Sequence, residues 1–419
     1  MSEIFKIAQL NTKAKENRVF IYLLFFIWPF LSLFFAIIDN RQSWAKNIVW
    51  LFVAFYGYTM VLSTSGIDAQ RYRDQFIKVA EEGRTIDEDI EYYKNDVNVV
   101  DFVKPILNII ISKITNDYKI LFLVYGLIFG YYFSRSLWLL IERYKHRVLG
   151  LSILLLIVFA LVNPIWNING FRFWTAAQIF VYGCLIYFLE DKKIGLLITL
   201  MTFFVHFSFL IPIVILFVYY FIGNRLTIYF YFFVTSLFIT ELNLEAVRSN
   251  LNFVPAIFEY KVNAYVREEY KEKRMINLQA TNWYVKWFDR ALKYSIYVFL
   301  ITIYWRGQGY IKKNKKLFRL FCFSLLLFGF VNIISSIPTV GRFINVAISL
   351  SLALVILYLQ FVEDKLMNLI VRISIPALLL FLIVSIRIGF YTMSLTTVLG
   401  NPLIAVFMKN DIALIDLIK

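Results

Sequence analysis

Long apolar runs separated by short polar segments make up most of the chain. The first run, 18–38, is too long and ends too polar for a cleaved signal peptide, so we interpret it as a retained helix. Further runs occupy 47–64, 119–140, 148–163, 171–189, 226–243, 291–305, 317–335, 343–361 and 370–388. Most are near the length that crosses a hydrocarbon core of about 30 Å, and they lack the alternation of a porin-type barrel. The pattern predicts an all-α polytopic membrane protein with about 11–12 transmembrane helices.

The apolar stretch 194–222 differs from the other runs in length. As one helix, its 29 residues would span about 43 Å and overshoot the hydrocarbon core. We therefore expect a broken helix or a helical hairpin, with the break near His206.

Composition agrees with a membrane protein. Only 17% of the 419 residues are charged and 60% are hydrophobic, whereas soluble domains carry about a quarter charged residues. These values exclude a water-soluble globular enzyme and a disordered protein. The net charge of +15 is explained by basic loops that orient the helices, so we do not expect nucleic acid as a partner.

The two cysteines and two histidines offer no metal site. Cys184 and Cys322 lie inside apolar runs without CxxC spacing. We expect neither a disulfide framework nor a zinc site, and no cofactor.

Basic residues in the short loops predict the orientation. The loops 142–147, 192–193 and 306–319 belong together on the cytoplasmic side, which requires 194–222 to leave and return to the same face. The same reasoning places the N-terminus outside, although four basic residues precede the end of the first run: Lys6, Lys13, Lys15 and Arg18.

Two long polar segments then fall on the outer face of a single membrane domain, 1–419. The first, 65–118, contains the apolar stretch Phe102–Ile114, which is too short to span and predicts an interfacial or re-entrant helix. The second, 244–290, carries mixed charges typical of a solvated helical cap. The turns 163–170 and 336–342 lie on the same face, and we look for function there.

A carboxylate, a guanidinium and a phenol follow the second run. If a helix begins there, Asp68, Arg71 and Tyr72 lie on one face at positions i, i+3 and i+4. The alternative is a helix cap with a local ion pair, because Asp after Gly is a common helix opener.

The turn 163–170 places amides and an indole beside Arg172. Side chains such as Asn169 and Trp166 suit hydrogen bonding and stacking on a sugar. Alternatively, Arg172 reaches the phosphates of ordinary lipid.

His206 is an ionisable group at membrane depth, which by default marks a functional cavity; the alternative is an imidazole bonded to a carbonyl freed at the helix break. Arg342 and Arg387 lie at the outer ends of two further runs. With Arg172 they place three guanidinium groups toward one leaflet, an arrangement suited to binding a diphosphate.

Taken in order along the chain, five short motifs resemble the EpsG-like, Wzy-type polysaccharide polymerases. The resemblance covers roughly residues 18–361, although Leu62-Ser63-Thr64-Ser65 stands where the family often has an arginine. The motifs are Gly66-Ile67-Asp68 with Arg71-Tyr72, Lys104-Pro105-Ile106-Leu107, Asn169-Gly170-Phe171-Arg172 with Ala176, Phe204-Val205-His206-Phe207-Ser208, and Gly341-Arg342-Phe343.

This resemblance implies a bacterial inner-membrane enzyme with a GT-C-like helical fold. It would polymerise undecaprenyl-diphosphate-linked oligosaccharide repeat units into an O-antigen, capsule or exopolysaccharide, at a site facing the outer leaflet. Membrane lipid surrounds it, and a flippase and a chain-length regulator are possible partners. The growing glycan is transferred to a sugar hydroxyl of the next lipid-linked unit.

The resemblance also implies roles for the candidate residues. Arg172 and Arg342 clamp the diphosphate without a metal, and either His206 or Asp68 is the base. The remaining candidates bind substrate: Arg71, Tyr72, Asn169 and Arg387. We expect these groups to share one chamber.

Two other classes share the hydropathy. A ligase joining finished glycan to another lipid would use similar residues, whereas a flippase or transporter would usually show repeated halves with interrupted helices. A purely structural membrane protein is disfavoured by ionisable groups at membrane depth.

Overall fold

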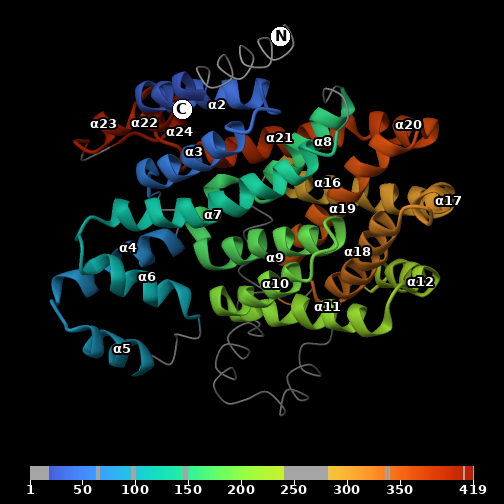
Figure 1. The fold of residues 1–419 in the computed structure, drawn as a ribbon, viewed down its shortest axis with the longest axis horizontal. Coiled ribbons are helices and arrows are strands. Elements are labelled where there is room, and N and C mark those ends of the chain that lie inside the picture. The colour runs from blue at the N-terminus through green and yellow to red at the C-terminus, as the bar shows by residue number, and fades with distance from the viewer. Residues whose placement is uncertain are drawn as a thin grey trace, which may run out of the picture.

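The computed structural model describes residues 18–62, 67–95, 101–144, 150–239, 282–335, 337, 340–408 and 411–418. These residues form helices, apart from an isolated antiparallel bridge between Ser394 and Ala413 (Figure 1). The helices are Arg18–Ile27, α2 Pro29–Ile38, α3 Ala45–Thr59, α4 Ile67–Glu81, α5 Ile86–Asn95, α6 Val103–Ser112, α7 Tyr118–Ile141, α8 Leu151–Val162, α9 Phe171–Leu189, α10 Ile194–Val205, α11 Leu210–Ile222, α12 Leu226–Ser236, α16 Trp283–Thr302, α17 Gln308–Ile311, α18 Lys315–Ile334, α19 Phe343–Phe361, α20 Lys365–Ile373, α21 Ile375–Gly389, α22 Leu395–Leu399, α23 Pro402–Ala405 and α24 Leu414–Ile418. Shorter 3₁₀ or π turns are η1 Ile165–Gly170, η2 Phe207–Phe209, η4 Ile303–Gly307 and η5 Val340–Arg342.

Several of these helices can cross a membrane. Four described segments are long and apolar enough: Tyr118–Ile141, Leu151–Leu189, Lys315–Ile334 and Val340–Phe361. The pair α20 and α21, bent by 47°, makes a fifth if it is one span. The chain is a polytopic helical membrane protein, and the count of about 11–12 crossings stays a prediction.

The segment Leu151–Leu189 turns back on itself at η1. Asn163 Nδ2 donates to the Trp174 carbonyl oxygen at 2.9 Å, and Gln178 Nε2 donates to the Asn163 carbonyl oxygen at 2.9 Å. In a straight helix, residues 11 apart would be about 16 Å apart. The chain therefore reverses direction between α8 and α9.

Ion pairs gather several helix ends at one end of the bundle, here called the basic end. Lys46 at the start of α3 pairs with Glu142 after α7, at 2.9 Å. Arg143 pairs with Glu190 after α9, and Arg319 near the start of α18 pairs with Asp191. The loops predicted to share one side thus meet at the basic end.

The opposite end of the bundle gathers the start of α9, the start of α19 and the break near His206. The Phe173 ring contacts Phe209 at 5.3 Å between centroids, Phe343 at 5.2 Å and His206 at 5.6 Å. We call this the opposite end.

The stretch 194–222 forms the predicted hairpin. Gly195 at the start of α10 lies against Gly183 and Tyr187 of α9, where a Cβ would be 2.4 Å from the Gly183 oxygen. α10 ends at Val205, His206 is extended, and α11 begins at Leu210. Tyr219 then contacts Phe188 near the end of α9, at 5.5 Å. α11 therefore returns to the basic end.

The N-terminus itself lies outside the described residues, but the first described residues do not lie on the side opposite the basic loops, where we expected the chain to begin. Tyr22 lies near the basic end, because Asn47 Nδ2 of α3 donates to its hydroxyl at 3.4 Å. Trp28 lies away from that end, where its Nε1 donates to the Val398 oxygen of α22 at 2.6 Å. Asn40 after α2 accepts from Trp138 Nε1 at 3.0 Å, again at the basic end. The run 18–38 is thus two helices that fold back at Trp28-Pro29, because Pro29 removes a helical hydrogen bond. Arg18 starts at the basic end.

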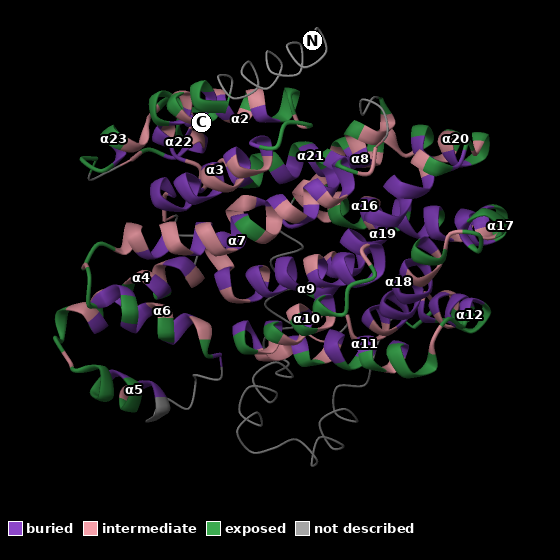
Figure 2. Cartoon of the chain, in the orientation of Figure 1, coloured by how far each residue is buried: buried purple, intermediate pink, exposed green. Residues whose placement is uncertain are grey.

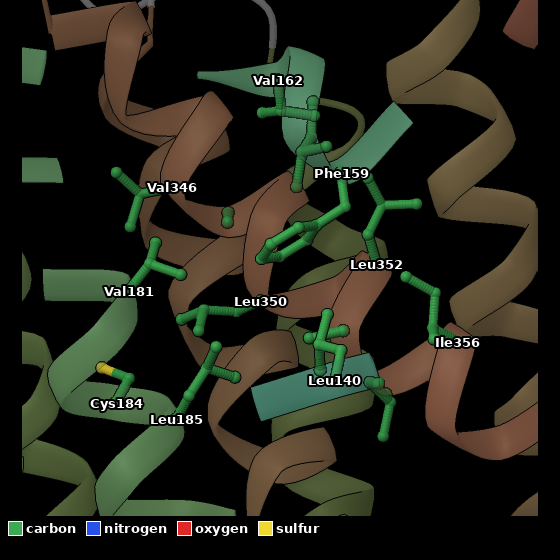
Figure 3. Close-up of a cluster of buried hydrophobic side chains, with 14 of the residues drawn as sticks. Leu140, Phe159, Val162, Val181, Cys184, Leu185, Val346, Leu350, Leu352 and Ile356 are labelled. Atoms are coloured by element: carbon green, nitrogen blue, oxygen red, sulfur yellow. The ribbon is translucent and has the colours of Figure 1, made fainter. Parts of the chain in front are cut away.

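The core lies where α7, α8, α9 and α19 meet. Figure 2 shows α19 buried along its length, while the outer helices expose one face. In Figure 3, Phe159 of α8 and Val181 of α9 surround Leu350 of α19, with Leu140 of α7 nearby. Small residues allow close approach elsewhere: a Cβ on Gly57 of α3 would lie 2.2 Å from the Phe122 oxygen of α7.

The predicted outer segment 65–118 contains the three helices α4, α5 and α6. In Figure 1, α4 and α6 lie beside α7, and α5 lies beyond α6. The short helix expected at Phe102–Ile114 is α6. The Phe102 amide donates to the Phe204 oxygen at 3.0 Å, which anchors α6 to the end of α10. The second segment, 244–290, lies outside the described residues up to 281; α16 begins at Trp283.

Candidate functional site at the opposite end of the bundle

Arg172 is the centre of a polar network at the start of α9. Phe171 is fully buried and stacks on Tyr125 of α7 at 3.8 Å with an angle of 8° between the rings, which fixes the first turn of α9. From this turn, Arg172 Nε donates to the Tyr72 hydroxyl at 3.1 Å and Nη1 donates to Asp101 Oδ2 at 2.8 Å. Neither bond uses Nη2, and 24% of the Arg172 side chain is exposed. Within the part of the chain that the structure describes, Nη2 has no hydrogen-bond partner and stays available for an anion.

Asp101 joins three parts of the chain. Its side chain is only 4% exposed, Oδ2 accepts from Arg172, and Oδ1 accepts from the Phe207 amide at 2.9 Å. The carboxylate thus ties the segment before α6 to α9 and to η2, immediately after His206. Sequence reasoning missed Asp101, because nothing in the polar stretch around it marks a partner 71 residues away.

Lys104 and Tyr72 fill the space between α4 and α6. Lys104 Nζ donates to Gln75 Oε1 of α4 and lies 4.8 Å from the centroid of the Tyr72 ring. Lys104 is 7% exposed and Tyr72 is 2% exposed. Burial, with Arg172 and Arg71 nearby, lowers the pKa of Lys104 to about 7. Burial also raises the pKa of Tyr72, although the nearby Arg172 opposes this change.

Asp68 and Arg71 form the outer part of the same cluster. They pair within the first turn of α4, with 36% and 53% of their side chains exposed. Asn169 Oδ1 accepts from the Ala69 amide at 3.2 Å, so Asn169 attaches η1 to the start of α4. Asp68 therefore forms the local ion pair that we gave as the alternative interpretation. This ion pair lies next to Tyr72 on α4.

His206 has a defined structural contact. Its Nδ1 accepts from the Ser208 amide at 3.3 Å and lies 2.8 Å from Ser208 Oγ, as an N-cap of η2. The imidazole packs on Phe173, and the Phe207 amide binds Asp101. His206 therefore lies at the edge of the network and caps the short helix at the break.

The remaining two arginines lie at the same end but have other contacts. Arg342 places its guanidinium carbon 5.5 Å from the Phe173 ring, on which His206 also packs. Arg387 Nη1 donates to the Tyr284 hydroxyl at 2.6 Å, between α21 and α16. The structure therefore brings Asp68, Arg71, Tyr72, Asn169 and Arg172 together, with His206 and Arg342 beside them, whereas Arg387 binds elsewhere at this end.

A cavity of about 310 Å³ lies between the end of α3, α4, the start of α7 and the C-terminal segment. Arg73, Lys119 and Asp411 line it together with Tyr58 and Tyr118. This volume is at the lower end of the range for ligand pockets, about 300–1,000 Å³. None of the candidate residues lines this cavity, so it is not the common chamber that we expected over them, although Arg73 directly follows Tyr72 in α4.

The carboxylates of the network already have cationic or amide partners. Asp101 binds Arg172 and the Phe207 amide, and Asp68 binds Arg71. Across the described parts of the chain, no group of three or more His, Cys, Asp or Glu side chains could hold a metal ion. The groups positioned to meet negative charge are guanidinium groups.

Comparison with known proteins places the chain in a family. No curated protein and no solved structure matches the chain. The family model described as the EpsG family matches residues 48–395, from α3 to the start of α22, and this range includes every residue of the network. The chain belongs to the EpsG family.

Proposed function

We propose that this protein polymerises undecaprenyl-diphosphate-linked oligosaccharide repeat units into a surface polysaccharide, an O-antigen, capsule or exopolysaccharide. The growing glycan leaves its lipid diphosphate and joins a sugar hydroxyl of the next lipid-linked unit. Membership of the EpsG family supports a polymerase-type activity. The proposed setting is the bacterial inner membrane, in one GT-C-like membrane domain whose site faces the outer leaflet.

The observation that carries the proposal is the network around Arg172. It joins the start of α4, the segment before α6, the start of α9 and the helix break, four segments far apart in sequence. Displacement at an anomeric carbon leaves a diphosphate, so the site must stabilise developing negative charge and remove a proton from the attacking hydroxyl. Guanidinium groups that stay charged and partly exposed suit the first task.

Each candidate residue has a proposed role in this reaction. Arg172 and Arg342 bind the diphosphate, and Arg71, Tyr72 and Asn169 orient the acceptor. Arg387 binds substrate farther along the same end, beside Tyr284. His206 and Asp68 stay the two candidates named for the base. The reaction is metal-independent, because the arginines supply the positive charge.

The direct test is polymerisation by the purified protein in liposomes. Supplied with a lipid-diphosphate-linked repeat unit, it should yield a ladder of longer lipid-linked products, and EDTA should not change that ladder. A flippase would only move the unit between leaflets, and a ligase would need a second class of lipid acceptor. Either outcome without a ladder would reject the proposal.

A further inference from the structure

We propose that Lys104 is the proton acceptor for the attacking sugar hydroxyl. This inference rests on the proposed polymerase function and adds a residue that the sequence marked only as part of the Lys104-Pro105-Ile106-Leu107 motif.

The position of Lys104 is set by its helix and by two neighbours on α4. Phe102 pins the start of α6 to α10, so the first turn of α6 faces the network. The ammonium nitrogen donates to Gln75 and lies over the Tyr72 ring, whose hydroxyl accepts from Arg172. Lys104 Nζ and the guanidinium carbon of Arg172 thus lie against the same tyrosine ring, 4.8 and 5.7 Å from its centroid.

The charges around Lys104 favour a neutral amine. Arg71 of α4 and Arg172 of α9 repel a proton on Nζ, while Asp68 of α4 and Asp101 before α6 attract one. Both carboxylates are already paired with these arginines. Burial is the largest cause and the repulsion adds to it, so the pKa of Lys104 falls to about 7 and a large fraction of the amine holds a lone pair at neutral pH.

The other two candidates are less suited to accept this proton. Asp68 is engaged by Arg71, whose guanidinium binds Oδ1 of the carboxylate. The His206 Nδ1 lone pair accepts from Ser208 to cap η2. Lys104 is bonded through a proton of Nζ to Gln75, an interaction that a neutral amine can keep.

The hydroxyl proton moves to the lone pair of Lys104 Nζ while the hydroxyl oxygen forms a bond to the anomeric carbon. The bond from that carbon to the phosphate oxygen breaks, and its electron pair leaves with the lipid diphosphate beside Arg172. The resulting ammonium adds a positive charge near the leaving group and later returns its proton to water.

The experiment measures the pH dependence of ladder formation by the full chain in liposomes. In the wild type, the rate should rise with pH through about 7 and then level off. Lys104→Met should lower the rate by about 100-fold or more, and Lys104→Arg should not restore it, because a guanidinium stays protonated. Lys78→Met, an exposed lysine of α4, is the matched control and should keep both rate and profile.

Three outcomes decide the inference. A wild type without a ladder would reject the proposed function itself, whereas a wild-type ladder with Lys104→Met within about threefold of it would reject only the role of Lys104. If Lys104→Met does not fold, Lys104→Arg decides: an unchanged profile rising through pH 7 contradicts the inference, and a low, flat rate supports it.

Discussion

At the residue scale, the Asp101 carboxylate holds the network together. Asp101→Asn keeps an oxygen for the Phe207 amide but removes the negative charge that positions Arg172. We expect polymerisation to fall by about 10-fold or more, because the guanidinium loses its fixed orientation. The rate of ladder formation by the purified variant is the measurement.

A second ion pair provides the control for Asp101. Glu190 binds Arg143 at the basic end, and Glu190→Gln removes a charge of the same kind far from the candidate site. Glu190→Gln should polymerise normally. Equal losses of polymerisation in Asp101→Asn and Glu190→Gln would show that Asp101→Asn acts by lowering the stability of the protein.

His206 is predicted to act through its cap. Asparagine is also a good N-cap, so His206→Asn should keep most polymerisation, while His206→Ala should lose about 1 kcal/mol of stability. Thermal unfolding in detergent and ladder formation measure the two effects. Inactive but well-folded His206→Asn would instead assign the imidazole to the chemistry.

The protonation of Lys104 also predicts a pH dependence of stability. Its pKa is about 7 in the fold and 10.5 in a model peptide, so the unfolded chain binds more protons between these values. The free energy of unfolding of the wild type, relative to Lys104→Met, should therefore rise from pH 7 to about 10.5. Melting temperatures across this pH range test the sign, and a falling difference would contradict it.

At the element scale, packing between α3 and α7 depends on the lack of a side chain at Gly57. A Cβ there would lie 2.2 Å from the Phe122 backbone oxygen. Gly57→Ala should cost about 1–3 kcal/mol, because one of the two backbones must move. Gly309 of α17 has no heavy atom within 4 Å of a built Cβ, so Gly309→Ala should be neutral or stabilising. Melting temperatures in detergent distinguish the two.

Hydrophobic runs predict many of these elements well, because a helix in lipid must satisfy its own backbone hydrogen bonds. The runs 119–140, 317–335 and 343–361 match α7, α18 and α19 within a few residues. The excess length of 194–222 also predicts the hairpin. The fold-back at Trp28-Pro29 was missed, although Pro29 inside the run was a visible signal.

The candidate site is harder to predict from the sequence than the helices are. Asp68, Arg71 and Tyr72 are placed by local helical spacing, and Asn169 and Arg172 by the motif they share. Asp101 and the burial of Lys104 depend on α6 packing against α4 and α10, which are long-range contacts without a periodic signal.

At the scale of the whole molecule, the basic end and the candidate site lie at opposite ends of the bundle. The positive-inside rule predicts that the basic end, and with it Arg18, lies in the cytoplasm. Cys184 and Cys322 are buried, so a thiol reagent should label an added exposed cysteine with little labelling of the two native ones.

Labelling of intact cells by a membrane-impermeant maleimide tests this orientation. Glu91→Cys on α5 should be labelled, whereas Arg18→Cys and Lys313→Cys should react only after the cells are permeabilised. Labelling of Arg18→Cys in intact cells would contradict the fold-back of the first run.

The most direct test of the account is ladder formation by Arg172→Ala next to Glu190→Gln, both purified and reconstituted with a lipid-diphosphate-linked repeat unit. Each substitution breaks one ion pair, at opposite ends of the bundle. Glu190→Gln should give the wild-type ladder and folded Arg172→Ala should give none. A full ladder from Arg172→Ala would contradict the claim that the network around Arg172 is the site of polymerisation.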